Sequence, residues 1–290
     1  MEVSKITELI ERIAPLPAAC SWDNSGVQVA ALCQDITSLA VCLDPTPNAV
    51  EQAMALGAQY ILSHHPLLMK PAYLNKLGSY HQVVRTLMTH DAWLYSAHTS
   101  LDASANGPVS WLAKELGLQD CTILEQTYEC PCAPSHNNLS SHDNHSSCSS
   151  DSSASKAQSE IFGLGMVGTL ATPLSWNDFI ARMQSLVPLD TATLCGPRPS
   201  MIQRIGYCTG SGSSLASRAF AKGADIFITG DVKYHTALDT LGPILDVGHF
   251  SLEEEMMKRL ASQLQASLGA EITVHFLASA DPLRPLGLSL

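Results

Sequence analysis

Two adjacent histidines, His64 and His65, follow the apolar segment 60–62 and precede Pro66. Neutral imidazole is the most common metal ligand among protein side chains. Neighbouring side chains on a strand point to opposite faces, but in the loop after a strand both rings can turn toward one cleft. A His-His pair is also typical of an exposed polar turn, so its assignment to a metal site depends on the rest of the chain.

Histidines and carboxylates also follow three other apolar segments that have the character of buried strands. In open α/β sheets, ligands gather beyond the carboxyl ends of the strands. Five of the eleven histidines lie at such ends, whereas random placement would scatter them over helix surfaces. The polar segments at the four strand ends are 63–66, 98–102, 230–235 and 248–253.

A shared site at these ends predicts five ligands for two divalent cations. His249 and Glu253 are four residues apart at the start of a predicted helix, so they project from one face. Imidazole mixed with carboxylate suits Zn, Fe, Mn or Co better than Ca, and one carboxylate can bridge two ions. Two ions about 3.5–4 Å apart lower the pKa of a bridging water and clamp an anionic intermediate. The predicted ligands are His64, His65, Asp102, His249 and Glu253.

Each carboxylate or lone histidine of this set has a simpler interpretation when taken alone. His249 is then a strand-end histidine bonded to the backbone, and Asp102 caps the turn that follows it. Glu253 is then the first residue of the solvated acidic run 253–255. Only their coincidence at strand ends favours the metal site.

Two further histidines and two loops are candidates for roles around this site. His98 and His235 are predicted to carry protons or to orient ligands, although 230–235 is also typical of a solvated turn. The backbone amides of 210–214 can hold a phosphate, but this segment lacks the Walker lysine and also fits a tight turn with a capping serine. The polar loop that begins at Trp22 is interpreted as anchored by a buried indole.

Strands and helices alternate along most of the chain. Continuous apolar strands separated by helices predict a mainly parallel sheet covered on both faces. Because both halves repeat the pattern, we expect an α/β fold of two similar lobes with mainly parallel sheets that face each other. The predicted strands are 39–43, 59–63, 92–97, 191–195, 202–208, 225–229, 243–247 and 271–276. The predicted helices are 4–14, 46–56, 79–90, 106–116, 175–186, 213–222, 234–241 and 250–268.

The segment 129–160 interrupts this alternation. It is rich in Ser, His, Asn and Asp and has few apolar residues, so it cannot bury enough surface to offset the entropy of ordering. We predict a disordered insert or linker between lobes 1–128 and 161–290. A metal-binding tract is the alternative, but the spacing of its ligands matches no zinc-finger pattern. Those ligands would be Cys132, His136, His142, His145 and Cys148.

Bulk composition excludes some classes of function. With 290 residues and a net charge of −11, the chain lacks the basic character needed for binding nucleic-acid phosphates directly. No apolar run approaches the ~20 residues that cross a bilayer, and the N-terminus does not resemble a signal peptide. The nine cysteines include no Cys-x-x-Cys pair, which favours free thiols in a reducing cytoplasm.

Taken together, the motifs resemble the NIF-three-like family of dinuclear-metal proteins, which includes the type 2 homologues of GTP cyclohydrolase I. The match covers both halves in the order of the family. Ser100 departs from it, standing where an asparagine is more usual, and some members carry a whole extra domain at the position of the Ser-rich segment. The matching motifs are WDNSG at 22–26, LDPT at 43–46, SHHP at 63–66, HTSLD at 98–102, ITGDVKYH at 228–235 and GHFSLE at 248–253.

This resemblance implies a particular division of the ligands between two divalent cations. His65 and Asp102 would serve one ion, His64 and His249 would serve the other, and Glu253 would bridge them. It also implies a toroidal homohexamer whose metal sites face an internal cavity.

Three functions are compatible with these observations. The first is a metal-dependent hydrolase acting on a nucleotide, in the cyclohydrolase version converting GTP to 7,8-dihydroneopterin triphosphate and formate. The second is hydrolysis of a phosphoester or an amide by the same metal pair. The third is a non-catalytic scaffold or metal-handling protein that binds partners through its assembled ring.

Overall fold

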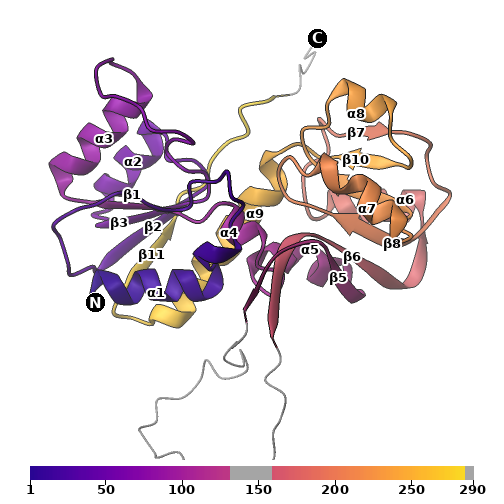
Figure 1. The fold of residues 1–290 in the computed structure, drawn as a ribbon, viewed down its shortest axis with the longest axis horizontal. Coiled ribbons are helices and arrows are strands. Elements are labelled where there is room, and N and C mark those ends of the chain that lie inside the picture. The colour runs from indigo at the N-terminus through magenta and orange to yellow at the C-terminus, as the bar shows by residue number, and fades with distance from the viewer. Residues whose placement is uncertain (131–158, 285–290) are drawn as a thin grey trace, which may run out of the picture.

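The computed structural model describes residues 1–130 and 159–284, and its elements form two sheets with helices around them (Figure 1). The prediction for 131–158, including its candidate ligands, lies outside the described residues. The ends of the predicted insert, 129–130 and 160, belong to two long strands.

The first sheet has the strand order β1-β4-β3-β2-β11. The last four strands are parallel, as predicted, and β1 runs antiparallel to β4. The central strands are short apolar runs buried on both faces, which is the pattern of a parallel sheet covered by helices. The strands are β1 (Gly26–Val29), β2 (Ser38–Cys42), β3 (Tyr60–Ser63), β4 (Trp93–Ser96) and β11 (Thr273–Phe276).

The second sheet is mixed, with the strand order β5-β6-β8-β9-β10-β7. Here β8, β9 and β10 are parallel, whereas β5, β6 and β7 pair antiparallel with their neighbours, so the parallel prediction holds only for the centre of this sheet. The strands are β5 (Leu118–Cys130), β6 (Glu160–Ser175), β7 (Thr193–Cys195), β8 (Met201–Tyr207), β9 (Ile226–Thr229) and β10 (Ile244–Asp246).

Each half of the chain contributes one strand to the sheet of the other half. β5 comes from the first half and joins the second sheet, and β11 comes from the end of the chain and joins the first. The division into lobes 1–128 and 161–290 stays a prediction about which parts of the chain fold as units. The structure shows in addition that the two halves exchange one strand each.

Helices cover both faces of the first sheet. α2 and α3 pack on one face through an apolar cluster that includes Ala40, Ile61 and Leu94, and α1 and α9 pack on the other (Figure 1). The helices are α1 (Val3–Ile13), α2 (Pro47–Ala55), α3 (Ser79–His90), α4 (Thr99–Asp102), α5 (Trp111–Leu116), α6 (Trp176–Gln184), α7 (Ala216–Ala221), α8 (Tyr234–Leu238) and α9 (Phe250–Leu268). Short 3-10 turns occupy Leu16–Ala18, Pro108–Ser110 and Ser213–Leu215.

The helix α9 connects the two sheets. It lies between them in Figure 1 and packs against β2 and β11, and the largest apolar cluster extends from it into both sheets. Among the buried residues of α9, Glu253 is the single charged one, in a stripe otherwise made of Leu, Met and Ala. A buried carboxylate is costly unless it is paired or binds a cation, so this position needs a specific partner. In the described part of the chain, no helix is both long and apolar enough to cross a membrane.

Candidate metal centre

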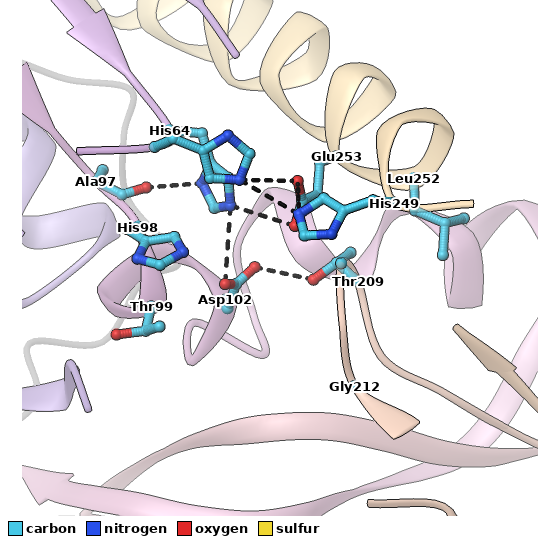
Figure 2. Close-up of polar contacts among 12 residues, drawn as sticks. His64, Ala97, His98, Thr99, Asp102, Thr209, Gly212, His249, Leu252 and Glu253 are labelled. Atoms are coloured by element: carbon cyan, nitrogen blue, oxygen red, sulfur yellow. Dashed lines mark hydrogen bonds and ion pairs between the residues drawn. The ribbon is translucent and has the colours of Figure 1, made fainter. Parts of the chain in front are cut away.

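The five predicted ligands converge where strands of both sheets end. His64 and His65 directly follow β3, and Asp102 ends the short helix α4 that follows β4. His249 directly precedes α9, and Glu253 lies in the first turn of this helix, so both follow β10 of the second sheet. Figure 2 shows His64, Asp102, His249 and Glu253 directed toward one another from these separate elements.

The Glu253 carboxylate lies at the centre of this cluster. Its Oε1 is 3.6 Å from Nε2 of His64, and its Oε2 is 3.3 Å from Nε2 of His65 and 3.1 Å from Nε2 of His249. Nε2 of His64 also lies 3.8 Å from Oδ2 of Asp102. The two carboxylate oxygens therefore face two different sets of ligands, which is the arrangement a bridging carboxylate requires.

The distances define two three-residue groups that share Glu253. One group contains His64 and Asp102, and the other contains His65 and His249, with potential ligand atoms in each group within 4.8 Å of one another. The resemblance implied a different division, in which His65 shared an ion with Asp102. The bridging position of Glu253 is common to both divisions.

Two buried atoms in the cluster are better placed to bind a cation than to form hydrogen bonds within the protein. Nε2 of His64 and Oε2 of Glu253 are inaccessible to solvent and have no hydrogen-bond partner among the described residues. Their nearest polar neighbours lie at 3.1–3.8 Å without hydrogen-bond geometry. Unsatisfied buried polar atoms are rare in native proteins. Lone pairs that converge without bonding one another are suited to binding ions placed between them.

The far nitrogen of each of the three histidines is bonded to an oxygen outside the cluster. Nδ1 of His64 lies 2.9 Å from the carbonyl oxygen of Ala97. Nδ1 of His65 is 2.8 Å from Asp44, and Nδ1 of His249 is 2.7 Å from Asp231. Histidines that bind metals almost always donate their other N–H to such an oxygen, which leaves the Nε2 lone pair for the ion. Asp44 and Asp231 lie within the LDPT and ITGDVKYH motifs, but sequence reasoning gave them no role at the ligands.

Burial and neighbouring charges shift the pKa values of both carboxylates. Burial by itself would raise the pKa of Glu253, but the surrounding histidines, His64 first among them, hold it well below its usual value. For Asp102, burial raises the pKa, and the negative charge of Glu253 adds to this effect against the opposing influence of His64. Glu253 is thus ionised at neutral pH, and a nearby cation would favour the ionised form of Asp102.

The more accessible histidines have raised pKa values for the same electrostatic reason. Burial would lower the pKa of His65, but Asp44 and Glu253 outweigh this effect and raise it to about 10. For His249, interaction with Glu253 is the main cause of a pKa of about 9, to which Asp231 contributes. In the protein without metal, these two imidazoles are therefore cationic at neutral pH and stand in for the positive charge of ions.

Two residues after β8 complete the wall of the centre. The hydroxyl of Thr209 donates to Oδ1 of Asp102 at 2.8 Å, which orients that carboxylate. Gly210 has a positive φ of 56°, and a Cβ at this position would overlap Oε1 of Glu253 and lie 3.3 Å from Nε2 of His249. The first glycine of the predicted phosphate loop is thus required for close approach to the ligands. The amide of Gly212 donates to the hydroxyl of Thr229, so this predicted phosphate-binding amide already has a partner within the fold.

The structure places the two predicted proton carriers very differently. The ring centre of His98 lies 5.2 Å from that of His64 and 5.5 Å from that of His65, and Figure 2 shows it beside His64 and Asp102. His235 is exposed on α8, where its described ring contact is with Tyr234.

The interpretation of Trp22 as a buried anchor is wrong. The indole is 62% exposed and meets the His98 ring edge-on, with 6.0 Å between the ring centres. The side chain of Asp23, the next residue, is inaccessible instead and accepts a 2.7 Å hydrogen bond from Nδ1 of His98. The composition of the loop indicates a turn, but which of its side chains is buried depends on what the loop packs against.

Relatives with known sequences cover nearly the whole chain. A protein of Clostridium perfringens described as a GTP cyclohydrolase 1 type 2 homolog is 28% identical over 289 residues, which cover 98% of each chain. A protein of Staphylococcus aureus with the same description is 26% identical, covering 89% of this chain and 91% of the relative.

Solved structures match the fold over its full length. The crystal structure of a Bacillus cereus protein related to NIF3 has a TM-score of 0.81 at 23% identity and covers 99% of both chains. A Staphylococcus aureus protein has a TM-score of 0.79 at 25% identity, again covering 99% of both chains. These likenesses confirm the α/β fold expected from the resemblance.

A family model identifies the chain independently of individual relatives. Residues 1–282 match the model described as Duf34/NIF3 (NGG1p interacting factor 3), which confirms the family suggested by the motifs. The matched range includes both sheets and all five predicted ligands. The chain belongs to the Duf34/NIF3 family.

Proposed function

We propose that this chain is a hydrolase that depends on two divalent cations per chain, Zn, Fe, Mn or Co, and acts on a nucleotide. The observation that carries this proposal is the position of Glu253, whose two oxygens face two separate ligand groups at 3.1–3.6 Å. When bound, a pair of cations lowers the pKa of water and offsets negative charge that develops on the substrate.

The residues of the chain itself would bind the substrate, orient it and move protons. His65 and His249 are 23% and 34% exposed, so the centre is open to a ligand on their side. His98 borders the imidazoles of His64 and His65 and the Asp102 carboxylate, and it is our candidate for the group that takes a proton from water. His235 is the second candidate for proton transfer, and its exposed position suits exchange with solvent.

The cyclohydrolase version assigns a specific reaction to this centre. Water adds to C8 of the guanine of GTP, the imidazole ring opens, and C8 leaves as formate. The remaining atoms close to 7,8-dihydroneopterin triphosphate, so the overall reaction consumes one water. The names of the relatives from Clostridium perfringens and Staphylococcus aureus support this version.

The test is to load purified protein with each of the four metals in turn and measure formate released from GTP. We expect formate in the wild type and its loss in Glu253→Gln, with His235→Ala as a second variant that reports on proton transfer. A wild type with two ions per chain that releases no formate would rule out the cyclohydrolase version. Release of phosphate or ammonia from another substrate, lost in Glu253→Gln, would then indicate a phosphoesterase or an amidohydrolase.

A non-catalytic role as a metal-binding scaffold is the remaining alternative. It predicts metal-loaded protein that is inert toward a broad set of metabolites and still binds a partner protein. We also propose a homo-oligomer, a toroidal hexamer by family likeness, in the cytoplasm. Support comes from large apolar side chains exposed on one loop: Met69, Tyr73, Leu74 and Leu77. Light scattering that gives the mass of six chains would agree with the hexamer, and the mass of one chain would contradict it.

A further inference from the structure

The buried carboxylate of Asp23 is saturated with hydrogen bonds. Its Oδ1 accepts from the amide of Asn24 and from Nδ1 of His98, both at 2.7 Å. Its Oδ2 accepts from the Ser25 hydroxyl at 2.7 Å, and from the Thr99 amide at 3.0 Å and hydroxyl at 2.5 Å. Although burial would raise the pKa of Asp23, the bonds from His98 and Thr99 hold it well below its usual value. Asp23 is therefore ionised, and its carboxylate can only accept hydrogen bonds.

This arrangement determines which nitrogen of His98 carries a proton. Because a carboxylate has no hydrogen to donate, Nδ1 of His98 must be the donor in their 2.7 Å bond. In the neutral ring, Nε2 then has a free lone pair. The ring lies against His64 and His65, and nitrogens of these three residues lie within 4.8 Å of one another. Nδ1 is held by Asp23, so Nε2 is the nitrogen left to face the centre.

His98 differs from the three predicted histidine ligands in one respect. Nε2 of each ligand lies within 3.6 Å of an oxygen of Glu253, the carboxylate shared by the two groups. Within the described residues, the His98 ring is in a salt-bridge contact only with Asp23 and in none with Glu253. His98 thus lies beside the metal centre but does not contact Glu253, the residue shared by the two ligand groups.

We propose that Asp23 is a positioning residue, which fixes His98 so that an unprotonated Nε2 faces the metal centre and accepts a proton from the attacking water. The role as a proton acceptor rests on the hydrolase function proposed above, whereas the orientation and the tautomer of His98 do not. The WDNSG segment then has a function: its aspartate bonds His98 and Thr99, residues of the HTSLD motif that also contains Asp102.

The substitution Asp23→Asn separates this role from simple packing, because it keeps the shape and exchanges one acceptor oxygen for an NH₂ donor. If the NH₂ replaces Oδ2, it opposes the partly buried amide of Thr99, which can only donate, whereas the hydroxyls of Ser25 and Thr99 can also accept. If it replaces Oδ1, it opposes the exposed amide of Asn24, which water can satisfy, and Nδ1 of His98. The second arrangement loses less, and it forces the proton of neutral His98 onto Nε2, where the lone pair was.

The experiment compares wild type, Asp23→Asn and His98→Gln, each loaded with Zn²⁺. NMR of ¹⁵N-histidine protein reports the tautomer of His98, whose signals are identified by their absence from His98→Gln. We expect a protonated Nδ1 in the wild type and a protonated Nε2 in Asp23→Asn. We also expect kcat for formate release from GTP to fall about 10²–10⁴-fold with KM little changed, as for loss of a general base.

Asp44→Asn and Asp231→Asn are matched controls, since each alters an aspartate bonded to Nδ1 of a predicted ligand. These two should weaken Zn²⁺ binding by about 10- to 100-fold, whereas Asp23→Asn should leave it unchanged. Zn²⁺ binding weakened in Asp23→Asn and His98→Gln would make His98 a ligand and overturn the proposal. An unchanged His98 tautomer in Asp23→Asn would overturn it as well. A wild type inactive on GTP would end the cyclohydrolase proposal, while the tautomer and metal measurements would still decide the orientation of His98.

Discussion

Oε2 of Glu253, in the first turn of α9, lies 3.1 Å from Nε2 of His249, the residue that precedes this helix. The same Glu253 carboxylate also faces His64 and His65, which belong to the other sheet. One side chain on the helix between the sheets therefore links the two ligand groups. The stability of the centre and its metal content should depend on this residue more than on any single histidine.

Glu253→Gln should lose both ions. The amide keeps the volume of the side chain but removes the negative charge, and its NH₂ cannot bind a cation. Elemental analysis of purified protein should give about two ions per chain in wild type and close to none in the variant. His235→Ala, an exposed change on α8, is the control and should keep both. Retention of two ions by Glu253→Gln would refute the shared position of this residue.

The division of ligands can be tested with double variants. In the structure, His65 and His249 belong to one group, and His64 and Asp102 to the other. The double variant His65→Ala/His249→Ala should therefore keep one ion, and its metal content should match that of either single variant. The division implied by family likeness puts these histidines on different ions and predicts that the double variant loses both. Metal content by mass spectrometry under native conditions distinguishes the two outcomes.

The stability of the metal-free protein should fall as the pH rises through 9 and 10. The pKa values of His249 and His65 are raised in the folded state to about 9 and about 10, from 6.5. Groups with raised folded pKa values contribute stability that is complete below about pH 6.5 and is lost as pH rises through the folded values. Thermal unfolding of apo wild type and apo His249→Ala should therefore converge at alkaline pH. A stability difference that grows with pH would contradict this assignment.

Metal binding should have the opposite pH dependence. His65 and His249 must lose their protons to bind a cation, so binding releases protons at neutral pH and strengthens as pH rises toward 9. Calorimetric titration with Zn²⁺ in buffers of different ionisation enthalpy measures the number of protons released. Binding that releases none at pH 7 would show that these imidazoles are neutral in the apo protein.

Gly210→Ala should abolish metal binding while leaving the fold intact. The new Cβ would overlap the Glu253 carboxylate, and the positive φ of 56° disfavours alanine by about 1–2 kcal/mol. Gly57→Ala is a matched control, because its φ is 72° and nothing lies within 4 Å of the added Cβ. Both variants should lose the stability that the positive φ costs, but only Gly210→Ala should also lose its ions and the stability that they contribute. Full metal content in Gly210→Ala would show that Glu253 can move aside.

The sequence alone determined those helices and strands that have a clear local pattern of apolar residues. The predicted helices 79–90 and 250–268 coincide with α3 and α9, and the strands that precede the ligands were found within one or two residues. The periodicity of apolar residues carries this information, because it follows from the geometry of each element. The long strands β5 and β6 were not predicted, since glycines at Gly163, Gly165 and Gly168 interrupt the apolar pattern of β6.

Only the tertiary structure decided how these elements combine. The exchange of β5 and β11 between the sheets, the grouping of His65 with His249, and the burial of Asp23 in place of Trp22 all depend on contacts between distant segments. A sequence pattern shows which residue types follow a strand, but not the direction of each side chain in the loop or the acceptor behind each imidazole. Those are set when the two sheets pack around α9, because that packing brings the strand ends within a few ångströms of one another.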